Sequence, residues 1–290
     1  MRIVVVGAGA WGTAFAKVLR DRQHDVFAAR RQTIDDAPYD EADLVVLAVP
    51  SHAFRDVFEH VSGQAPILIL TKGLDPAGGD RLSTLVRGRA VAVLSGPNMA
   101  EEIAEGLPGA AVIASEDERL ATRLQEAINS PIFRVYVQTD VTGVELCGAA
   151  KNVIALAAGG VDGLGLGDNA KAALITRGLV EMARLGEACG AEQETFAGLA
   201  GMGDLIVTCF HPSGRNRRAG EMIARGATPE EARAAIGQVV EGLTTAPALR
   251  DLSHRIGVEL PITEGVCSVL DGHPLDELAA SLMGRRPTAE

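Results

Sequence analysis

The first fifteen residues, MRIVVVGAGAWGTAF, constrain the fold of this chain more than any other stretch. Residues 2–6, RIVVV, are mostly β-branched, which is typical of a short buried strand. Gly7, Gly9 and Gly12 follow in G-x-G-x-x-G spacing, and residues 11–19 have a helical pattern. In this motif the first glycine permits a tight turn, the second lets a pyrophosphate approach the backbone, and the third lets helix and strand pack closely. We therefore expect a dinucleotide-binding turn, with a glycine-rich turn that binds nothing as the alternative.

Alternating strands and helices are predicted through the first half of the chain, and only helices after it. The predicted strands cover residues 24–29, 42–49, 66–70, 91–94, 110–114 and 134–137, with an amphipathic helix at 117–128. From residue 142 onward the pattern is helical as far as Leu282, and the last residues are expected to fray. The fold class predicted is an α/β Rossmann-type domain over residues 1–140 followed by an all-α domain over residues 141–290.

The residues that follow the second predicted strand bear on the choice of cofactor. A carboxylate there would accept hydrogen bonds from the ribose 2′-OH of NAD. This chain has Arg30 and Arg31 instead, and guanidinium groups suit a 2′-phosphate. Asp35 and Asp36 come too late in the next loop to serve the ribose. We expect NADP(H), with NAD(H) as the second candidate; a solvated basic pair is the alternative for the two arginines.

Polar residues follow three successive predicted strands. Ser51 and His52 come after the third strand, Lys72 after the fourth and Asn98 after the fifth. Because the carboxyl ends of parallel strands form the ligand-binding edge of such sheets, we expect these residues to share a site. His52 is open to a catalytic interpretation, but a residue that begins a helix near the cofactor is the preferred one.

The helical half places a lysine inside an apolar helix. Residues 144–158, VELCGAAKNVIALAA, are small or apolar on nearly every side, so this helix should be buried. Lys151 in its middle either points inward, which would lower its pKa and allow proton exchange near neutral pH, or extends to water; both remain open. Residues 198–203 predict a break in the chain before Asp204, which can cap the next helix, and Thr208 lies one turn along the same face.

A dense basic run, HPSGRNRR, occupies residues 211–218 of an otherwise acidic chain. Gly214 can expose its backbone N–H, and Arg215 and Asn216 can hold a phosphate in a forked arrangement. A solvated patch of charge is the competing interpretation.

Composition excludes several classes of function. The net charge of −11 argues against nucleic acid or an anionic membrane surface as a partner, and no apolar run is expected to reach the length of a transmembrane helix. The four cysteines are far apart and form no C-x-x-C, as expected of reduced thiols in the cytoplasm. The six histidines form no zinc-binding pattern, so no metal site is predicted.

Motifs along the whole chain resemble those of the soluble bacterial NAD(P)-dependent glycerol-3-phosphate dehydrogenases. The matching segments are GAGAWGTA, VPSH, TKGL, SGPN, KNVIA, NAKAALITRGL, GLAGMGDL, GRNRR, GQVVEG and PITE. The resemblance implies reduction of dihydroxyacetone phosphate, a triose phosphate, to sn-glycerol 3-phosphate with NAD(P)H, which supplies phospholipid synthesis. It also implies a cytoplasmic homodimer whose helical domain is like that of 6-phosphogluconate dehydrogenase.

The same resemblance implies roles for individual residues. Lys151 would be the proton donor and acceptor, with Asp204 and Lys72 as the other catalytic residues. The substrate would be bound by Lys72, Gly96, Asn98, Lys151, Asp204, Thr208, Gly214, Arg215 and Asn216. To the glycines and arginines described above, the resemblance adds Ala10, Trp11, Lys72, Ala100, Arg215, Val239 and Glu241 as residues that line the cofactor.

The chain departs from this family in two places. Residues 32–43 form a shorter segment than the family usually has before the VPSH strand, so the adenine side of the cofactor site should be more open. Ala10 and Gly214 stand where the family usually has serine, so two hydroxyls are lost while the backbone N–H groups remain.

Two other functions fit the same two-domain plan. One is a related reductase that acts on a different small hydroxy acid or keto acid, against which the GRNRR segment argues. The other is a regulatory protein that binds the cofactor without turnover, against which the retention of Lys72, Lys151 and Asp204 argues.

Overall fold

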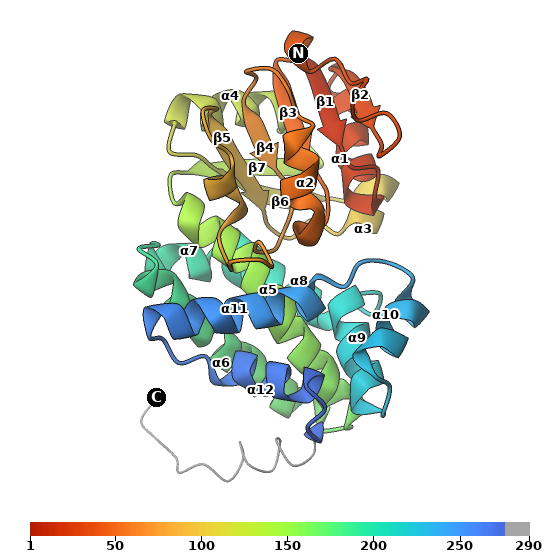
Figure 1. Ribbon diagram of the computed structural model, residues 1–290, viewed down its shortest axis with the longest axis vertical. Helices are drawn as coiled ribbons and strands as arrows, with labels where there is room; N and C mark the ends of the chain where they lie inside the picture. Colours follow the sequence, from red (N-terminus) through yellow and green to blue (C-terminus); the bar gives the residue numbers. More distant parts are fainter. Residues whose placement is uncertain (276–290) are drawn as a thin grey trace.

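The computed structural model describes residues 1–275 and consists of a sheet domain stacked on a helical domain (Figure 1). The strands are β1 (Arg2–Val6), β2 (Asp25–Ala29), β3 (Leu44–Leu47), β4 (Ile67–Ile69), β5 (Val91–Ser95), β6 (Gly109–Ala114) and β7 (Phe133–Gln138). Their order in the sheet is β2-β1-β3-β4-β5-β6-β7, and all neighbours are parallel except β5 and β6. The winding therefore reverses between β1 and β3, which is the point where such sheets bind ligands.

Helices cover both faces of the sheet and make up the second domain. The sheet domain contains α1 (Ala10–Asp21), α2 (Phe54–Glu59), α3 (Ala100–Glu105) and α4 (Glu118–Ile128). The second domain contains α5 (Val141–Gly163), α6 (Gly167–Ala188), α7 (Gln193–Ala197), α8 (Asp204–Phe210), α9 (Arg215–Ala224), α10 (Pro229–Ile236), α11 (Glu241–Ile256) and α12 (Pro261–Leu270). Residues 139–275 contain no strand, so the predicted fold class is confirmed.

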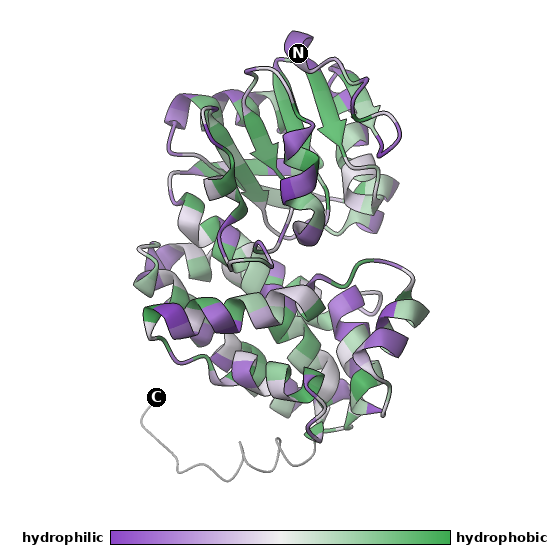
Figure 2. Ribbon diagram, viewed as in Figure 1, coloured by the Kyte–Doolittle hydropathy of each residue, from purple (hydrophilic) through white to green (hydrophobic). Residues whose placement is uncertain are grey.

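The five strands between the two edge strands are buried on both faces along most of their length, as their continuous apolar runs predict (Figure 2). One face packs against α1 and α4 through a core that includes Phe15, Leu19 and Leu124. The other face packs against the first half of α5, which contributes Val144 and Ala150. The same helix then continues into the second domain, so α5 belongs to the cores of both.

Helix α5 also overturns the expectation that no apolar run is long enough to span a membrane. Its 23 residues include an 18-residue window with a mean hydropathy of 1.3, which is sufficient by length and composition. However, 89% of that window is buried inside the protein. The apolar character of α5 is therefore explained by its position between the sheet and the other helices.

The short segment between β2 and β3 leaves β2 at the edge of the sheet. Only Ala29 of β2 is buried, and Phe27 is 38% exposed. Residues 32–43 cross to β3 with one 3₁₀ turn, Tyr39–Glu41, and the side chains of Ile34 and Tyr39 join the core. Within the described part of the chain, no element covers the outer edge of β2.

The change from strands to helices falls between Gln138, the last residue of β7, and Val141, the first of α5. The carboxylate of Asp140 caps α5 by accepting a hydrogen bond from the Gly143 N–H at 2.7 Å. We keep residue 140 as the proposed domain boundary. The expected helical packing as far as Leu282 and the frayed end lie, beyond residue 275, outside the described residues.

Candidate active site

The glycine-rich turn after β1 has the geometry that each glycine of the motif requires. Gly7 has a φ of +108°, and a Cβ there would lie 2.4 Å from the Ala48 carbonyl oxygen. A Cβ on Gly12 would lie 2.0 Å from the Gly7 oxygen, whereas one on Gly9 would meet nothing within 4 Å. Helix α1 begins at Ala10 with no side-chain cap. Its first N–H groups therefore lack intrahelical partners beside an open backbone, which fits a pyrophosphate.

The other predicted cofactor residues of the sheet domain lie around this turn. Arg30 and Arg31 are exposed just after β2, and neither guanidinium forms an ion pair within residues 1–275. Trp11 packs its ring at 5.6 Å from that of Phe15, so the side chain belongs to the core between α1 and β7. Ala100 is the first residue of α3. Both exposed arginines are thus available to a ligand at the β2 edge.

Glu241 joins the two domains in this structure, whereas Val239 contacts another residue of the helical domain. Glu241, the first residue of α11, accepts hydrogen bonds from the Ser51 N–H at 3.1 Å and from the Ser51 hydroxyl at 2.6 Å. The Val239 carbonyl accepts a hydrogen bond from Arg215 Nη1 at 2.9 Å. His52, beside Ser51, is exposed in a 3₁₀ turn, as the helix-start interpretation expects.

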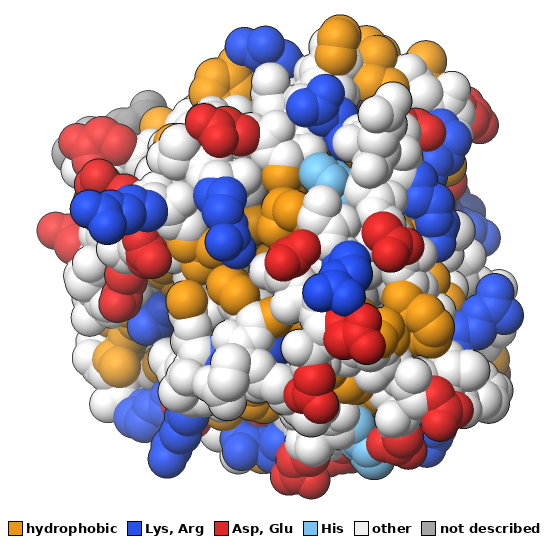
Figure 3. All heavy atoms as spheres, turned by 90° about the horizontal axis from the view of Figure 1, so that it is seen from above, with side chains coloured by type: hydrophobic (Ala, Val, Ile, Leu, Met, Phe, Trp, Pro, Cys, Tyr) orange, Lys and Arg blue, Asp and Glu red, His pale blue; other side chains and the backbone are white. Residues whose placement is uncertain are grey.

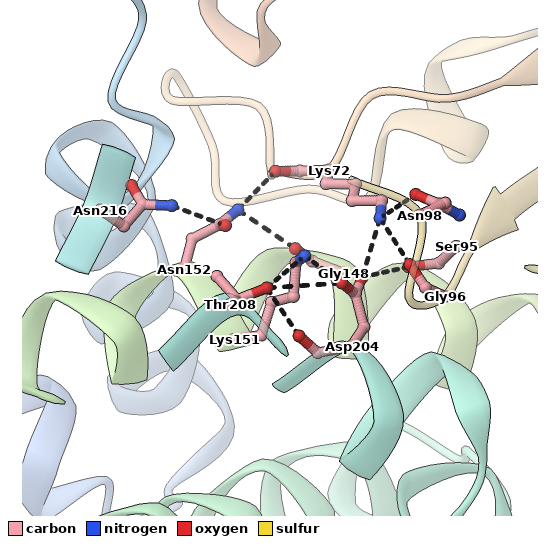
Figure 4. A network of polar contacts seen from close by, with 10 residues as sticks. All are labelled: Lys72, Ser95, Gly96, Asn98, Gly148, Lys151, Asn152, Asp204, Thr208 and Asn216. Carbon is pink, nitrogen blue, oxygen red and sulfur yellow. Dashed lines mark hydrogen bonds and ion pairs between the residues drawn. The ribbon is translucent and has the colours of Figure 1, made fainter. Parts of the chain in front are cut away.

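Two lysines from different domains share one buried carboxylate (Figure 4). Lys151 Nζ lies 2.5 Å from Asp204 Oδ1, and Lys72 Nζ lies 2.8 Å from Asp204 Oδ2. Lys72 also donates to the Gly96 carbonyl at 3.1 Å and to Asn98 Oδ1 at 2.9 Å. The structure therefore brings five predicted site residues together at the junction of the two domains.

The Lys151 side chain points inward and is only 7% exposed, which decides between the two interpretations of this residue. Desolvation by burial lowers its pKa to about 8; Asp204 opposes this shift, and the second cation Lys72 adds to it. The Thr208 hydroxyl accepts a second hydrogen bond from Nζ at 2.9 Å. An ammonium has three N–H donors, so one N–H of Lys151 remains for a ligand.

Asp204 does not cap its helix, which corrects the prediction. Gly203 holds the cap position of α8, and the Asp204 side chain makes no capping hydrogen bond. The preceding residues do not break the chain but form a π-helical turn, Leu199–Gly203, a feature often found at functional sites. Burial alone would raise the pKa of Asp204, but Lys151 and Lys72 together hold it below its ordinary value. The residue is therefore an ionised counter-ion.

Two residues in this network escaped the sequence analysis. The Ser95 hydroxyl donates to Asp204 Oδ2 at 3.3 Å. Asn152 donates to the Lys72 carbonyl at 2.9 Å and accepts from Asn216 Nδ2 at 2.8 Å. Its signal in the sequence was an amide inside an apolar helix, next to Lys151. Asn152 thus links the lysine cluster to the basic segment.

The basic segment is only partly as predicted. The Gly214 N–H is not exposed to an anion, because it donates to the His211 carbonyl at 3.0 Å. Asn216 is buried, and its oxygen accepts a hydrogen bond from the Gly242 N–H at 2.9 Å. One amide N–H of Asn216 and most of the exposed Arg215 guanidinium remain for a ligand. The segment is therefore not a solvated patch throughout.

Charges on the surface of the sheet domain are mixed in sign. Viewed onto that end of the molecule, lysine and arginine side chains alternate with aspartate and glutamate (Figure 3). The described residues hold no group of three or more histidine, cysteine or acidic side chains arranged for a metal ion. This end of the molecule therefore shows no large surface of one charge, in contrast to the paired lysines, Lys72 and Lys151, at the domain junction.

Known proteins match both parts of the chain. Models described as the N-terminus and the C-terminus of NAD-dependent glycerol-3-phosphate dehydrogenase match residues 31–121 and 140–279. The glycerol-3-phosphate dehydrogenase (NAD(P)+) of Halorhodospira halophila is 42% identical over 325 positions, which cover 99% of this chain and 98% of that protein. The corresponding protein of Corynebacterium glutamicum is 41% identical over 329 positions, with 99% of each covered. Both alignments exceed the 290 residues present, so these relatives contain residues without a counterpart here.

Solved structures agree with this result. The glycerol-3-phosphate dehydrogenase of Coxiella burnetii superposes with a TM-score of 0.92 at 35% identity, over 98% of this chain and 99% of that one. A ketopantoate reductase of Ralstonia eutropha, with a TM-score of 0.59 and 17% identity over 96% of this chain and 100% of that one, shares the fold alone. Since both the N-terminal and C-terminal models match and full-length relatives are more than 40% identical, the chain belongs to the NAD-dependent glycerol-3-phosphate dehydrogenase family.

Proposed function

We propose that this protein interconverts dihydroxyacetone phosphate and sn-glycerol 3-phosphate with NAD(P)H as cofactor. The observation that carries the proposal is the buried Lys151–Asp204–Lys72 cluster at the junction between the dinucleotide-type sheet and the helical domain. Within this cluster, Lys151 is a proton donor of lowered pKa. The similarity to glycerol-3-phosphate dehydrogenases along the whole chain supports the same reaction. When bound, the nicotinamide cofactor supplies or accepts the hydride at the carbon that changes oxidation state.

Lys151 is the residue proposed to move the proton. In ketone reduction, its ammonium stabilises the negative charge that develops on the carbonyl oxygen and then protonates that oxygen. In alcohol oxidation, its neutral amine takes the hydroxyl proton. A pKa of about 8 makes both forms accessible near neutral pH. Asp204 holds the ammonium in place and supports its charge until the transfer.

Lys72 and Asn98 are proposed to hold the polar end of the substrate near Lys151. All three N–H donors of Lys72 already have acceptors, so it contributes a fixed positive charge and rigid geometry. Asn98 Nδ2, in contrast, is buried without any hydrogen-bond partner in the described structure. A buried donor without an acceptor is unfavourable, and a substrate oxygen would satisfy it.

Arg215 and Asn216 are proposed to anchor the substrate phosphate. Binding energy at this group, away from the reacting carbon, would fix the orientation of the ketone. Asn216 is a poor probe, because Asn216→Ala would also remove the acceptor of the Gly242 N–H and the donor to Asn152 Oδ1. Arg215→Met should raise KM for dihydroxyacetone phosphate by about ten- to a hundredfold. Arg218 lies one turn further along α9, is exposed and forms no ion pair within residues 1–275, so Arg218→Met supplies the matched control.

The experiment that tests the reaction measures NADPH and NADH oxidation with dihydroxyacetone phosphate. Ketopantoate and the oxidised partner of 3-hydroxyisobutyrate serve as competing substrates, because a reductase of the same fold would prefer one of them. We expect turnover with dihydroxyacetone phosphate alone. Preference for an unphosphorylated acid would refute the proposed substrate, and cofactor binding without turnover on any ketone would favour a regulatory protein.

We also infer a homodimer that works in the cytoplasm. Support comes from the resemblance described above and from the four cysteines, none of which forms a disulfide. Light scattering on the purified protein tests the dimer, since a single species of 30.2 kDa would contradict it. Fractionation of the native cells tests the location.

A further inference from the structure

A second cluster of charges, partly buried, lies at the far end of α5, away from Lys151. Asp162 Oδ2 accepts hydrogen bonds from Lys171 Nζ at 2.8 Å and from Arg217 Nη1 at 2.5 Å. The Lys171 side chain is 7% exposed, and its ammonium lies 4.8 Å from the centroid of the Phe210 ring. Asp162 is eleven residues beyond Lys151, which is about 16 Å along a helix. The cluster therefore does not touch the reacting atoms.

The charge state of this cluster makes Asp162 a shared counter-ion. Burial alone would raise the pKa of Asp162, but hydrogen bonds from Lys171 and Arg217 hold it below its ordinary value. Glu221 adds a second carboxylate, at 3.3 Å from Arg217 Nη1. Arg225 also pairs with Glu221, at 2.7 Å, so three cations meet two carboxylates here, and Arg217 is fixed from two sides.

Arg217 connects this cluster to the turn that precedes α9. Its Nε donates to the His211 carbonyl at 3.3 Å, and its Nη2 donates to the Pro212 carbonyl at 3.2 Å. The turn, residues 211–214, closes with the hydrogen bond from Gly214 to His211. Directly after it come Arg215 and Asn216. A single guanidinium therefore ties the end of α5 to the segment that leads into the proposed phosphate anchor.

Close packing between glycines of α5 and α9, and not the Arg217 side chain, holds α9 in position on α5. A Cβ on Gly159 of α5 would lie 1.8 Å from the Arg217 carbonyl oxygen, and one on Gly220 would lie 1.9 Å from the Leu156 oxygen. The two helices pack backbone to backbone at these glycines. Loss of the Arg217 side chain should therefore release residues 211–214 and, with them, Arg215 at the start of α9, while the rest of α9 stays on α5.

We infer that Arg217, held by Asp162 and Glu221, is a positioning residue that sets the phosphate specificity of the enzyme by fixing the turn before α9. The inference rests on the proposed function, because it requires Arg215 and Asn216 to bind a phosphate. A fixed turn presents these donors in one geometry, so the substrate does not have to order them on binding. The phosphorylated ketone gains from this order, and an unphosphorylated ketone does not.

The test compares Arg217→Met with Arg217→Lys, Lys171→Met and the control Arg218→Met. For each variant we measure Tm, the Kd for NADPH, and kcat and KM for dihydroxyacetone phosphate and dihydroxyacetone. Arg217→Met should raise KM for dihydroxyacetone phosphate about tenfold or more, leaving kcat within about threefold and the NADPH Kd unchanged. Its kcat/KM for dihydroxyacetone should stay at the wild-type value, which a general loss of structure would not allow.

The remaining variants separate positioning from charge. Arg217→Lys keeps a cation for Asp162 but cannot reach both carbonyls of the turn, so its KM should fall between those of wild type and Arg217→Met. Lys171→Met should show a smaller KM effect, because Arg217 still pairs with Asp162. Arg218→Met should match the wild type.

Failure of the inference can be distinguished from failure of the proposed phosphate site. If Arg215→Met abolishes the preference for the phosphorylated ketone but Arg217→Met does not, the phosphate site stands and the positioning role is refuted. If Arg217→Met impairs both ketones equally, or only lowers kcat, the positioning role is also refuted. If Arg215→Met leaves the phosphate preference intact, the proposed anchor itself is wrong, and the inference fails with it.

Discussion

Replacing Asp204 by asparagine should move the pH range in which the enzyme reduces its ketone. The substitution keeps the shape of the side chain but removes the single carboxylate that contacts both Lys151 and Lys72. Burial has already lowered the pKa of Lys151 to about 8 against the opposing effect of Asp204. Without that opposing charge, and with Lys72 still nearby, the pKa of Lys151 should fall further, to a value well below 8.

The size of the effect follows from the fraction of Lys151 that is protonated. Reduction needs the ammonium, so kcat/KM should fall as pH rises through about 8 in the wild type and at a distinctly lower pH in Asp204→Asn. At pH 7.5 the variant should then be slower from protonation alone, by about tenfold for each unit by which its pKa lies below the assay pH. Part of that loss should be recovered when the pH is lowered. The assay is kcat/KM for dihydroxyacetone phosphate between pH 5.5 and 9.5.

The control removes a neutral contact from the same ammonium. Thr208→Val deletes the hydroxyl that accepts a hydrogen bond from Lys151 but leaves the carboxylate in place. Its alkaline limb should therefore lie closer to pH 8 than that of Asp204→Asn. An alkaline limb that remains at about pH 8 in Asp204→Asn would refute the reasoning. So would an equal loss of rate at every pH, because Asp204 would then act through geometry and not through charge.

Further predictions concern the proton donor, the cofactor preference and the glycine-rich turn. Lys151→Met should lower turnover by roughly two to four powers of ten while cofactor binding, measured by titration, stays near normal; near-normal turnover in the folded variant would end this assignment. Replacing Arg30 and Arg31 by alanine should weaken NADPH selectively, with a contribution on the order of 1.5–3 kcal/mol; an unchanged ratio of kcat/KM for NADPH and NADH would show that they do not contact the 2′-phosphate. Gly9→Ala should keep the wild-type Tm, because its Cβ enters open space, yet raise the Kd of both cofactors. Gly12→Ala should lower Tm, because its Cβ collides with the turn; the reverse pattern would contradict the proposed pyrophosphate position.

Local pattern was sufficient for the fold class and for much of the site. The spacing of Gly7, Gly9 and Gly12 has one mechanical explanation, and all three glycines have the geometry it requires. The strands were recognisable because parallel strands buried on both faces are continuous apolar runs. The positions of Lys72 and Asn98 followed from their places just after such strands, since parallel strands end at a common edge.

Contacts between distant segments could not be obtained from local pattern. Whether Lys151 points inward depends on α8, which supplies Asp204 and Thr208 from more than fifty residues away. Asp204 had a plausible local role as a helix cap, but two cations outside its own helix draw its carboxylate to them instead. The Gly214 N–H was expected to be free, but it donates a hydrogen bond to the His211 carbonyl, which closes the turn.

Helix α5 is another case in which local sequence leaves two possibilities open and the tertiary structure decides between them. Its composition and length are compatible with a membrane span as well as with a buried core helix, because both environments exclude water from apolar side chains. What surrounds α5 settles the matter: a sheet face packs on one half and helices α6, α8, α9 and α11 pack on the rest. A side chain's chemistry is encoded locally, but its partners, and hence its pKa and its role, depend on which other segments the folded chain brings to it.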